Sequence, residues 1–189
     1  MSLKIIGIVR KLGEKRQKLE RAYRKIRGRD LFLAAYGKLY AKSLATTPGV
    51  DHQKVDGMSL KRIDKIIEQL EYGTYQWKPV FLVYIEKKNG KLRPLGLPGW
   101  NDKLLQEVIR MVLEAYYEPQ FSKYSHGFRP GRGCHTALDE IRKRWKGVKW
   151  FIEGDIKGCF DNINHRVLMG LIREQISDEQ FCKLLKDMY

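Results

Sequence analysis

Apolar residues recur at helical spacing in several stretches of the chain. The clearest case is residues 60–70, where one face carries Leu60, Ile63, Ile66, Ile67 and Leu70. Ser59 precedes this stretch as a candidate N-cap, and Gly73 follows it as a stop signal. Asn101 or Asp102 is a candidate cap for a further helix that ends near Tyr117. The same spacing predicts helices over residues 30–45, 135–145, 166–176 and 178–188.

A hairpin is predicted between the helix over residues 60–70 and the helix that ends near Tyr117. The run Val80–Ile85 is apolar and mostly β-branched or aromatic, which is typical of a strand. Asn89-Gly90 is a strong turn signal, and a second strand returns from Lys91. Cations surround the predicted tip and could grip a phosphate chain, but lysines also protect exposed strand edges, and the sequence favours neither reading. These cations are Lys87, Lys88, Lys91 and Arg93.

Another strand is predicted over Val148–Gly154, and it ends at a carboxylate, Asp155. An acid at the tip of a buried strand suits a two-metal phosphoryl-transfer site, in which Mg²⁺ takes hard oxygen ligands. Asp155 would supply one ligand and the Ile156 carbonyl another, and Phe160 would lie over the sugar of an incoming nucleotide. Taken alone, a lone Asp at this position is more often a turn or helix cap.

The segment 1–29 combines a thin apolar stripe with a large positive charge. Leu12, Leu19, Tyr23 and Ile26 lie near helical spacing, which predicts one basic amphipathic helix. The segment holds 11 Lys and Arg against 2 acids, so it carries 9 of the 15 net charges. A contact with RNA or DNA phosphates and a merely solvated face fit equally well, and membrane-surface binding fits less well. The candidate contacts are Arg10, Lys11, Lys15, Arg16, Lys18, Arg24 and Lys25.

Residues 122–138, SKYSHGFRPGRGCHTAL, form an irregular basic stretch. Its three glycines let a backbone approach a ligand closely, and its arginines and aromatics suit single-stranded nucleic acid. Arg129 and Arg132 are the candidate RNA contacts, although a well-packed loop would explain the composition equally well.

Composition limits the kinds of partner that the chain is expected to bind. The chain has 189 residues, 43% hydrophobic and 31% charged, with a net charge of +15, which favours a polyanionic partner and one domain with at most a small appendage. No apolar run is long enough for a membrane span, and the N-terminus is not a convincing signal peptide, so no membrane is expected. Three cysteines without C-x-x-C spacing argue against disulfides and zinc, and suit a reducing, cytoplasmic-type compartment.

Four motifs, in order, resemble the reverse transcriptases encoded in group II introns. The resemblance covers the chain from about Tyr36 to its end. TTPGVD resembles the family's N-terminal extension motif, and KKNGKLRPLGLP its fingers hairpin. SHGFRPGRGCHTAL resembles the second fingers block, and EGDIKGCFDNINH the first palm motif.

This resemblance implies an α+β fold, with right-hand polymerase fingers, part of a palm, and helices packed on a small antiparallel sheet. The implied divisions are a basic extension over 1–29, fingers over 30–147 and partial palm over 148–189. It implies that Asp155 binds metal, that Phe160 excludes a ribose 2′-hydroxyl, and that Lys87 and Arg93, with Lys91 as a second candidate, contact the triphosphate. The implied partners are intron RNA, a template-primer and deoxynucleoside triphosphates, with Mg²⁺ in the complete enzyme; a homodimer is left open.

The chain departs from the family pattern in one respect. The family's Y-x-D-D motif, which brings the remaining catalytic carboxylates, has no counterpart before Tyr189. The sequence therefore predicts the N-terminal portion of an RNA-directed DNA polymerase that binds intron RNA and assists splicing and mobility, and that is catalytically incomplete alone. The alternative is an RNA-binding module, or truncated maturase fragment, that works without polymerisation.

Overall fold

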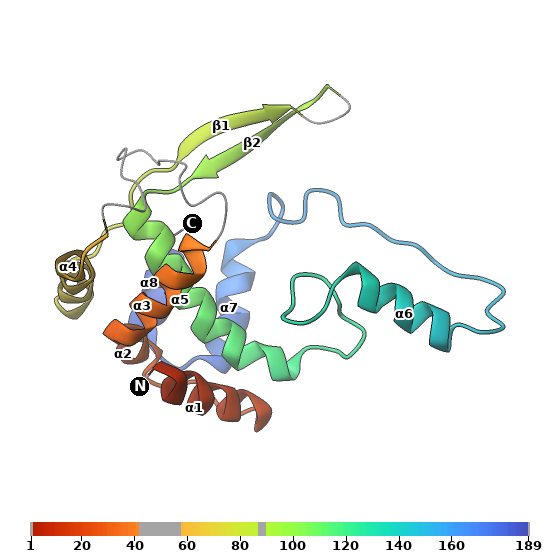
Figure 1. The fold of residues 1–189 in the computed structure, drawn as a ribbon, viewed down its shortest axis with the longest axis horizontal. Helices are drawn as coiled ribbons and strands as arrows, with labels where there is room; N and C mark the ends of the chain where they lie inside the picture. Colours follow the sequence, from red (N-terminus) through yellow and green to blue (C-terminus); the bar gives the residue numbers. More distant parts are fainter. Residues whose placement is uncertain (1, 42–57, 87–89, 189) are drawn as a thin grey trace.

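The computed structural model describes residues 2–41, 58–86 and 90–188. Most of these residues form helices, and one two-stranded antiparallel ribbon projects from the helical body (Figure 1). In the described ranges, no helix has both the length and the apolar character to cross a membrane. The elements are α1 (Ser2–Glu14), α2 (Ala22–Ile26), α3 (Arg29–Tyr40), α4 (Leu60–Glu71), β1 (Phe81–Glu86), β2 (Leu92–Leu97), α5 (Trp100–Tyr117), the 3₁₀ turn η3 (Glu118–Gln120), α6 (Cys134–Arg144), α7 (His165–Gln175) and α8 (Glu179–Lys186).

Helix α5 is the centre of the core. Its side chains are buried on several sides, including Leu104, Leu105, Val108 and Val112, because α1 and α3 pack along it. Helices α1 and α5 approach closely at Gly13 of α1, where a Cβ atom would lie 2.0 Å from the Tyr116 carbonyl oxygen. Only glycine fits there, so this single position allows α1 to reach the central helix.

The apolar patterns predicted most helices correctly. Ser59 caps α4, since its side chain accepts a hydrogen bond from the Arg62 N–H at 3.3 Å. Buried Ile63, Ile66 and Leu70 then form the inner face of that helix. Helix α5 begins slightly earlier than predicted, at Trp100 after Gly99, so neither Asn101 nor Asp102 is its N-cap.

The prediction of one basic helix within residues 1–29 is wrong. The segment forms two helices, α1 and α2, because the chain turns between them. Arg16 and Arg21 both take left-handed backbone angles at φ 51°, which an α-helix does not accept. Leu19 in the turn pairs with Ile176 as an isolated parallel bridge, and this long-range contact holds the turn in place.

The β1–β2 hairpin is confirmed, with Phe81 opposite Leu97 and Glu86 opposite Leu92. The mixture of helices with a small antiparallel sheet is also as expected. In the described part of the chain, however, the expected packing of helices on that sheet is not found. Five of the six β1 side chains and five of the six β2 side chains are exposed, so the core forms between helices and the ribbon stands outside it.

The predicted strand over Val148–Gly154 is wrong for this structure. Residues 148–156 have no regular secondary structure, and the segment between α6 and α7 forms a long loop outside the helical body (Figure 1). A strand needs a neighbour for its backbone groups, and among the described residues the only named strands are β1 and β2, which pair with each other. Trp150, Phe151 and Ile152 are consequently exposed despite their apolar side chains.

Candidate nucleic-acid interface

The cations of α1, α2 and the turn between them face solvent. Arg10, Lys11, Lys15, Arg16, Lys18 and Arg24 are all exposed, while the apolar side chains of the same segment line the core. Lys25 differs from these, because it is half-buried and its ammonium donates to the Glu20 carbonyl. Burial lowers the pKa of Lys25, which makes it the least suited of the group to a phosphate contact.

The turn that carries Lys15, Arg16 and Lys18 is held firmly. The Leu19 N–H donates to the Gln175 carbonyl at 2.9 Å, and the Ser177 N–H donates back to the Leu19 carbonyl at 3.2 Å. The Tyr116 hydroxyl also donates to the Gln17 carbonyl at 2.8 Å. Because its backbone is fixed from two sides, the turn presents its three cations at a defined edge of the molecule.

The ribbon carries a second set of cations. Lys91 precedes β2 and is exposed, as is Arg93 within β2, opposite Ile85. Lys87, the other predicted triphosphate contact, lies outside the described residues. The ribbon projects from the helices (Figure 1), so Lys91 and Arg93 are exposed on an element that stands outside the core.

Arg129 is placed differently from a surface phosphate contact. Its side chain is only 8% exposed and pairs with Glu118, with Nη2 at 2.9 Å from Oε1. Nη1 donates to the carbonyls of Ser122 and Ser125 at 2.7 and 2.8 Å. The guanidinium also lies over the Phe121 ring, 5.4 Å from its centre. The geometry gives Arg129 the role of holding residues 118–129 together, and its contact with RNA remains a prediction.

Arg132 supports the same loop from the other side. Its Nη1 donates to the Lys123 carbonyl at 2.6 Å. Phe128, directly before Arg129, has a left-handed backbone at φ 57° and a fully exposed ring. The loop is therefore well ordered by internal contacts, which agrees with the packed-loop reading of its composition as much as with nucleic-acid binding.

The residues predicted to bind metal are not gathered into a site. Asp155, Ile156 and Phe160 are all exposed in the irregular segment before α7. Across residues 2–41, 58–86 and 90–188, no three His, Cys, Asp or Glu side chains lie where they could hold a metal ion together. Two Mg²⁺ ions need several converging carboxylates, and Asp155 alone does not provide them, so these described residues do not fit a complete two-metal centre.

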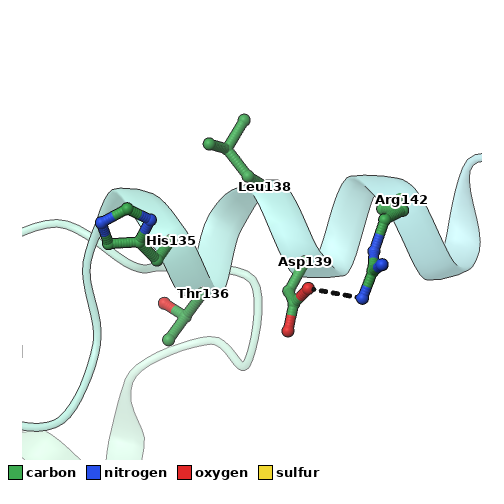
Figure 2. Close-up of a pocket in the computed structure, with 5 residues that line it drawn as sticks. All are labelled: His135, Thr136, Leu138, Asp139 and Arg142. Atoms are coloured by element: carbon green, nitrogen blue, oxygen red, sulfur yellow. Dashed lines mark hydrogen bonds and ion pairs between the residues drawn. The ribbon is translucent and has the colours of Figure 1, made fainter.

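Two hollows are unrelated to these residues. Figure 2 shows the first, of about 350 Å³, whose five lining residues all come from α6. In it Arg142 pairs with Asp139 at 3.1 Å, so the hollow is one exposed helix face and not a cleft between elements. The second is a larger apolar groove of about 710 Å³ between α5, α7, α8 and the loop that contains Phe121 and Phe128.

Sequence reasoning missed one structurally important carboxylate. Asp102 was expected at a helix cap, but it is 2% exposed in the first turn of α5 and accepts a hydrogen bond from the Tyr75 hydroxyl at 2.7 Å. Its partner lies 27 positions earlier. A spacing of that kind carries no local pattern, so no periodicity could have indicated the pair.

Comparison with known proteins agrees with these motifs. Over 166 residues, the chain is 49% identical to the group II intron-encoded protein LtrA of Lactococcus lactis subsp. cremoris, with 87% of this chain and 28% of that protein covered. It is 47% identical over 158 residues to an uncharacterized 91 kDa protein in the cob intron of Schizosaccharomyces pombe, with 84% of this chain and 20% of that protein covered. It is 26% identical over 174 residues to nuclear intron maturase 1, mitochondrial, of Arabidopsis thaliana, with 83% of this chain and 24% of that protein covered.

The chain thus spans about a quarter of the length of these relatives. Residues 85–189, more than half of the chain, match the family described as reverse transcriptase (RNA-dependent DNA polymerase). This match begins at the end of β1 and includes β2, α5 and the segment around Asp155. The chain therefore belongs to the reverse transcriptase family, and it has group II intron-encoded proteins among its relatives.

Proposed function

We propose that this chain is the RNA-binding fingers and partial palm of a group II intron-type reverse transcriptase that helps its intron to splice and move. The observation that carries the binding part is the exposed row Lys15, Arg16 and Lys18 on a backbone-fixed turn. When these cations contact RNA phosphates, the counterions condensed on the RNA are released, which favours binding. Because the backbone of the turn is already fixed, little conformational entropy of the protein is lost on binding. In the longer protein, deoxynucleoside triphosphates and a template-primer would meet Lys87, Lys91, Arg93 and Phe160.

Divalent-metal chemistry belongs to this proposal only for the longer protein. There, Mg²⁺ would be held by Asp155 and the Ile156 carbonyl together with carboxylates from elsewhere, and it would activate a hydroxyl nucleophile. In the described part of this chain those acids do not converge, so RNA binding without polymerisation is what the isolated chain supports. Purified residues 1–189 should accordingly incorporate no nucleotide on a primed RNA template with Mg²⁺.

A filter-binding titration across salt concentrations tests the RNA-binding proposal. The probe is a group II intron transcript, compared with an unstructured RNA of the same length. Wild-type affinity for the transcript should fall steeply with salt, and the triple variant Lys15→Ala/Arg16→Ala/Lys18→Ala should lower the log–log slope by about 2 to 3.

The matched control removes the same number of charges from other elements. Lys61, Lys65 and Lys183 are exposed on α4 and α8, so their triple replacement by Ala changes net charge equally. Under the proposal this control keeps most of the slope. Equal losses in the two triple variants, or a flat salt response in the wild type, would mean that the turn is not an RNA contact.

A further inference from the structure

The β1–β2 ribbon depends on its two ends for its direction. Most of its side chains are exposed, with Phe81 at 55%, Tyr84 at 61% and Leu92 at 62% exposure. Within residues 2–41, 58–86 and 90–188, neither face therefore packs against a helix that could fix the ribbon's angle. Its direction must be set where the chain enters β1 from residues 74–80 and where it leaves β2 into α5.

Asp102 joins these two ends. It lies in the first turn of α5, five residues after β2 ends at Leu97, and its carboxylate is buried. One oxygen accepts from the Tyr75 hydroxyl at 2.7 Å, and the other accepts from the Lys78 N–H at 3.2 Å. Both donors belong to the segment that leads into β1, so a single side chain ties the incoming strand to the outgoing one.

Neighbouring contacts fix this junction to the helical body. The Arg62 Nε of α4 donates to Asn101 Oδ1 at 2.5 Å, directly beside Asp102. The Trp77 indole N–H donates to the Leu184 carbonyl of α8 at 3.0 Å. The rings of Tyr75 and Trp77 meet edge to face, 5.4 Å apart. Elements far apart in sequence thus converge on the base of the ribbon.

The chemistry of the pair keeps the Tyr75 hydroxyl available as a donor at physiological pH. Burial, and then the neighbouring Asp102 charge, raise the pKa of Tyr75 far above its ordinary value. The phenol therefore stays protonated and remains a donor. A buried carboxylate is costly unless it is hydrogen-bonded, so Asp102 gains by keeping both donors.

We propose that Asp102 is a positioning residue that holds the β1–β2 ribbon at one angle to α5, so that Lys91 and Arg93 meet the phosphates of bound RNA together. The geometric half of this inference concerns the ribbon alone. The functional half rests on the proposed RNA binding. The tests below separate the two.

The distance between spin labels on the ribbon and on the core measures the geometric half. Labels at Glu86→Cys and Lys38→Cys are placed in a background with Cys134→Ser and Cys159→Ser, which removes the exposed thiols. The wild-type distance distribution should be narrow. Asp102→Ala should broaden it at least twofold, while Tyr75→Phe, which removes one donor and keeps the ring, should broaden it less.

Val108→Ala is the matched control, because Val108 is buried on the same helix and touches neither end of the ribbon through a polar group. It should lower the melting temperature without broadening the distribution. If Asp102→Ala fails to fold, Tyr75→Phe and Asp102→Asn decide the matter, since both keep the shape of the site. Unchanged widths in the variants that fold, or equal broadening in Val108→Ala, would overturn the inference.

The salt dependence of binding to the intron transcript measures the functional half. Lys91→Ala/Arg93→Ala should lower the slope by about 1.4 to 1.8 in the wild type, and by less than half as much in the Asp102→Asn background. An undiminished effect in that background overturns the positioning role even if the ribbon broadens. Absence of any RNA binding contradicts the proposed function and the functional half, whereas the distance measurement still decides the geometric half.

Discussion

The Asp178 side chain accepts a hydrogen bond at 2.9 Å from the backbone N–H of Tyr23, 155 positions earlier in the chain. Its second oxygen accepts from the Phe181 N–H at 3.1 Å. One carboxylate therefore satisfies N–H groups at the start of both α2 and α8, which would otherwise lack partners. Through this contact the basic N-terminal segment and the last helix form one unit.

Asp178→Ala should lower the free energy of unfolding by about 2.5 to 4 kcal/mol. The loss combines an N-cap, which contributes about 1 kcal/mol, with a charge-assisted long-range hydrogen bond, which contributes about 1.5 to 3 kcal/mol. Urea unfolding followed by far-UV circular dichroism measures it.

Asp187→Ala is the control for this prediction, since Asp187 is exposed at the opposite end of α8. Its replacement should change stability by no more than about 0.5 kcal/mol. A loss under 1 kcal/mol for Asp178→Ala would mean that water replaces the carboxylate at both helix ends.

Local patterns predicted local structure and failed where a distant partner decides it. The apolar spacing of residues 60–70 and the strand-forming run Val80–Ile85 act within a few residues, and α4 and the β1–β2 pairing formed as expected. The predicted Asn89-Gly90 turn falls partly on Asn89, which lies outside the described residues. The break between α1 and α2 depends instead on Leu19 meeting Ile176. No periodicity in residues 1–29 contains that information.

The same reasoning explains which features of the candidate site could be predicted from the sequence. Asp155 was expected at the end of a strand, but a strand exists only when a neighbour pairs with it, and residues 148–156 are irregular here. The two cationic regions were predictable, because charge is a property of composition. The buried role of Arg129 was not, since an arginine reads the same in sequence whether it pairs with RNA or with Glu118.

Arg129→Ala should destabilise the chain by about 3 kcal/mol. Removing one partner of a buried ion pair leaves the other charge uncompensated, and here several loop carbonyls also lose their donor. Arg129→Lys should cost about 2 kcal/mol, because an ammonium keeps the charge but cannot reach Glu118 and the carbonyls simultaneously. Urea unfolding of both variants provides the measurement.

The exposed pair of Arg142 with Asp139 supplies the comparison, and Arg142→Ala should cost no more than about 0.5 kcal/mol. RNA affinity measured on folded Arg129→Lys then separates the two roles of Arg129. If stability is unchanged while affinity for the intron transcript drops tenfold, Arg129 is an RNA contact and not a loop anchor.

Alkaline pH should destabilise the fold through its buried tyrosines. Burial raises the pKa of Tyr75 above its ordinary value of 10.0. Below pH 10 both folded and unfolded chains keep this proton, so its contribution is complete. Above pH 10 only the unfolded chain loses it, and the fall in stability should approach about 1.4 kcal/mol per pH unit for this group as the pH rises further.

Tyr75→Phe should therefore reduce the slope of unfolding free energy against pH between 10 and 11 by about 1 kcal/mol per unit. Burial also raises the pKa values of Tyr23 and Tyr117, so part of the slope remains. Asp102→Asn keeps the Tyr75 phenol buried, and should retain the wild-type slope over this range. Identical slopes for wild type and Tyr75→Phe would show that the phenol is not buried.

Phe160 offers a choice between a packing role and a sugar-selecting role. Its ring is 83% exposed in this structure, so Phe160→Val should change the unfolding free energy of the 189-residue chain by less than about 0.5 kcal/mol. A core residue would cost several times more.

In the longer enzyme the same substitution should reveal selection against ribose. A ring against C2′ of the incoming sugar would clash with a 2′-hydroxyl, and steric rejection discriminates more strongly than a missing contact of about 1 to 3 kcal/mol. Phe160→Val should therefore admit ribonucleotides at least tenfold better, with only a modest loss for deoxynucleotides. Single-nucleotide kinetics measure the ratio of the two efficiencies. A constant ratio accompanied by lower stability would make Phe160 a packing residue of the complete palm, because a ring that supports the core affects both sugars equally.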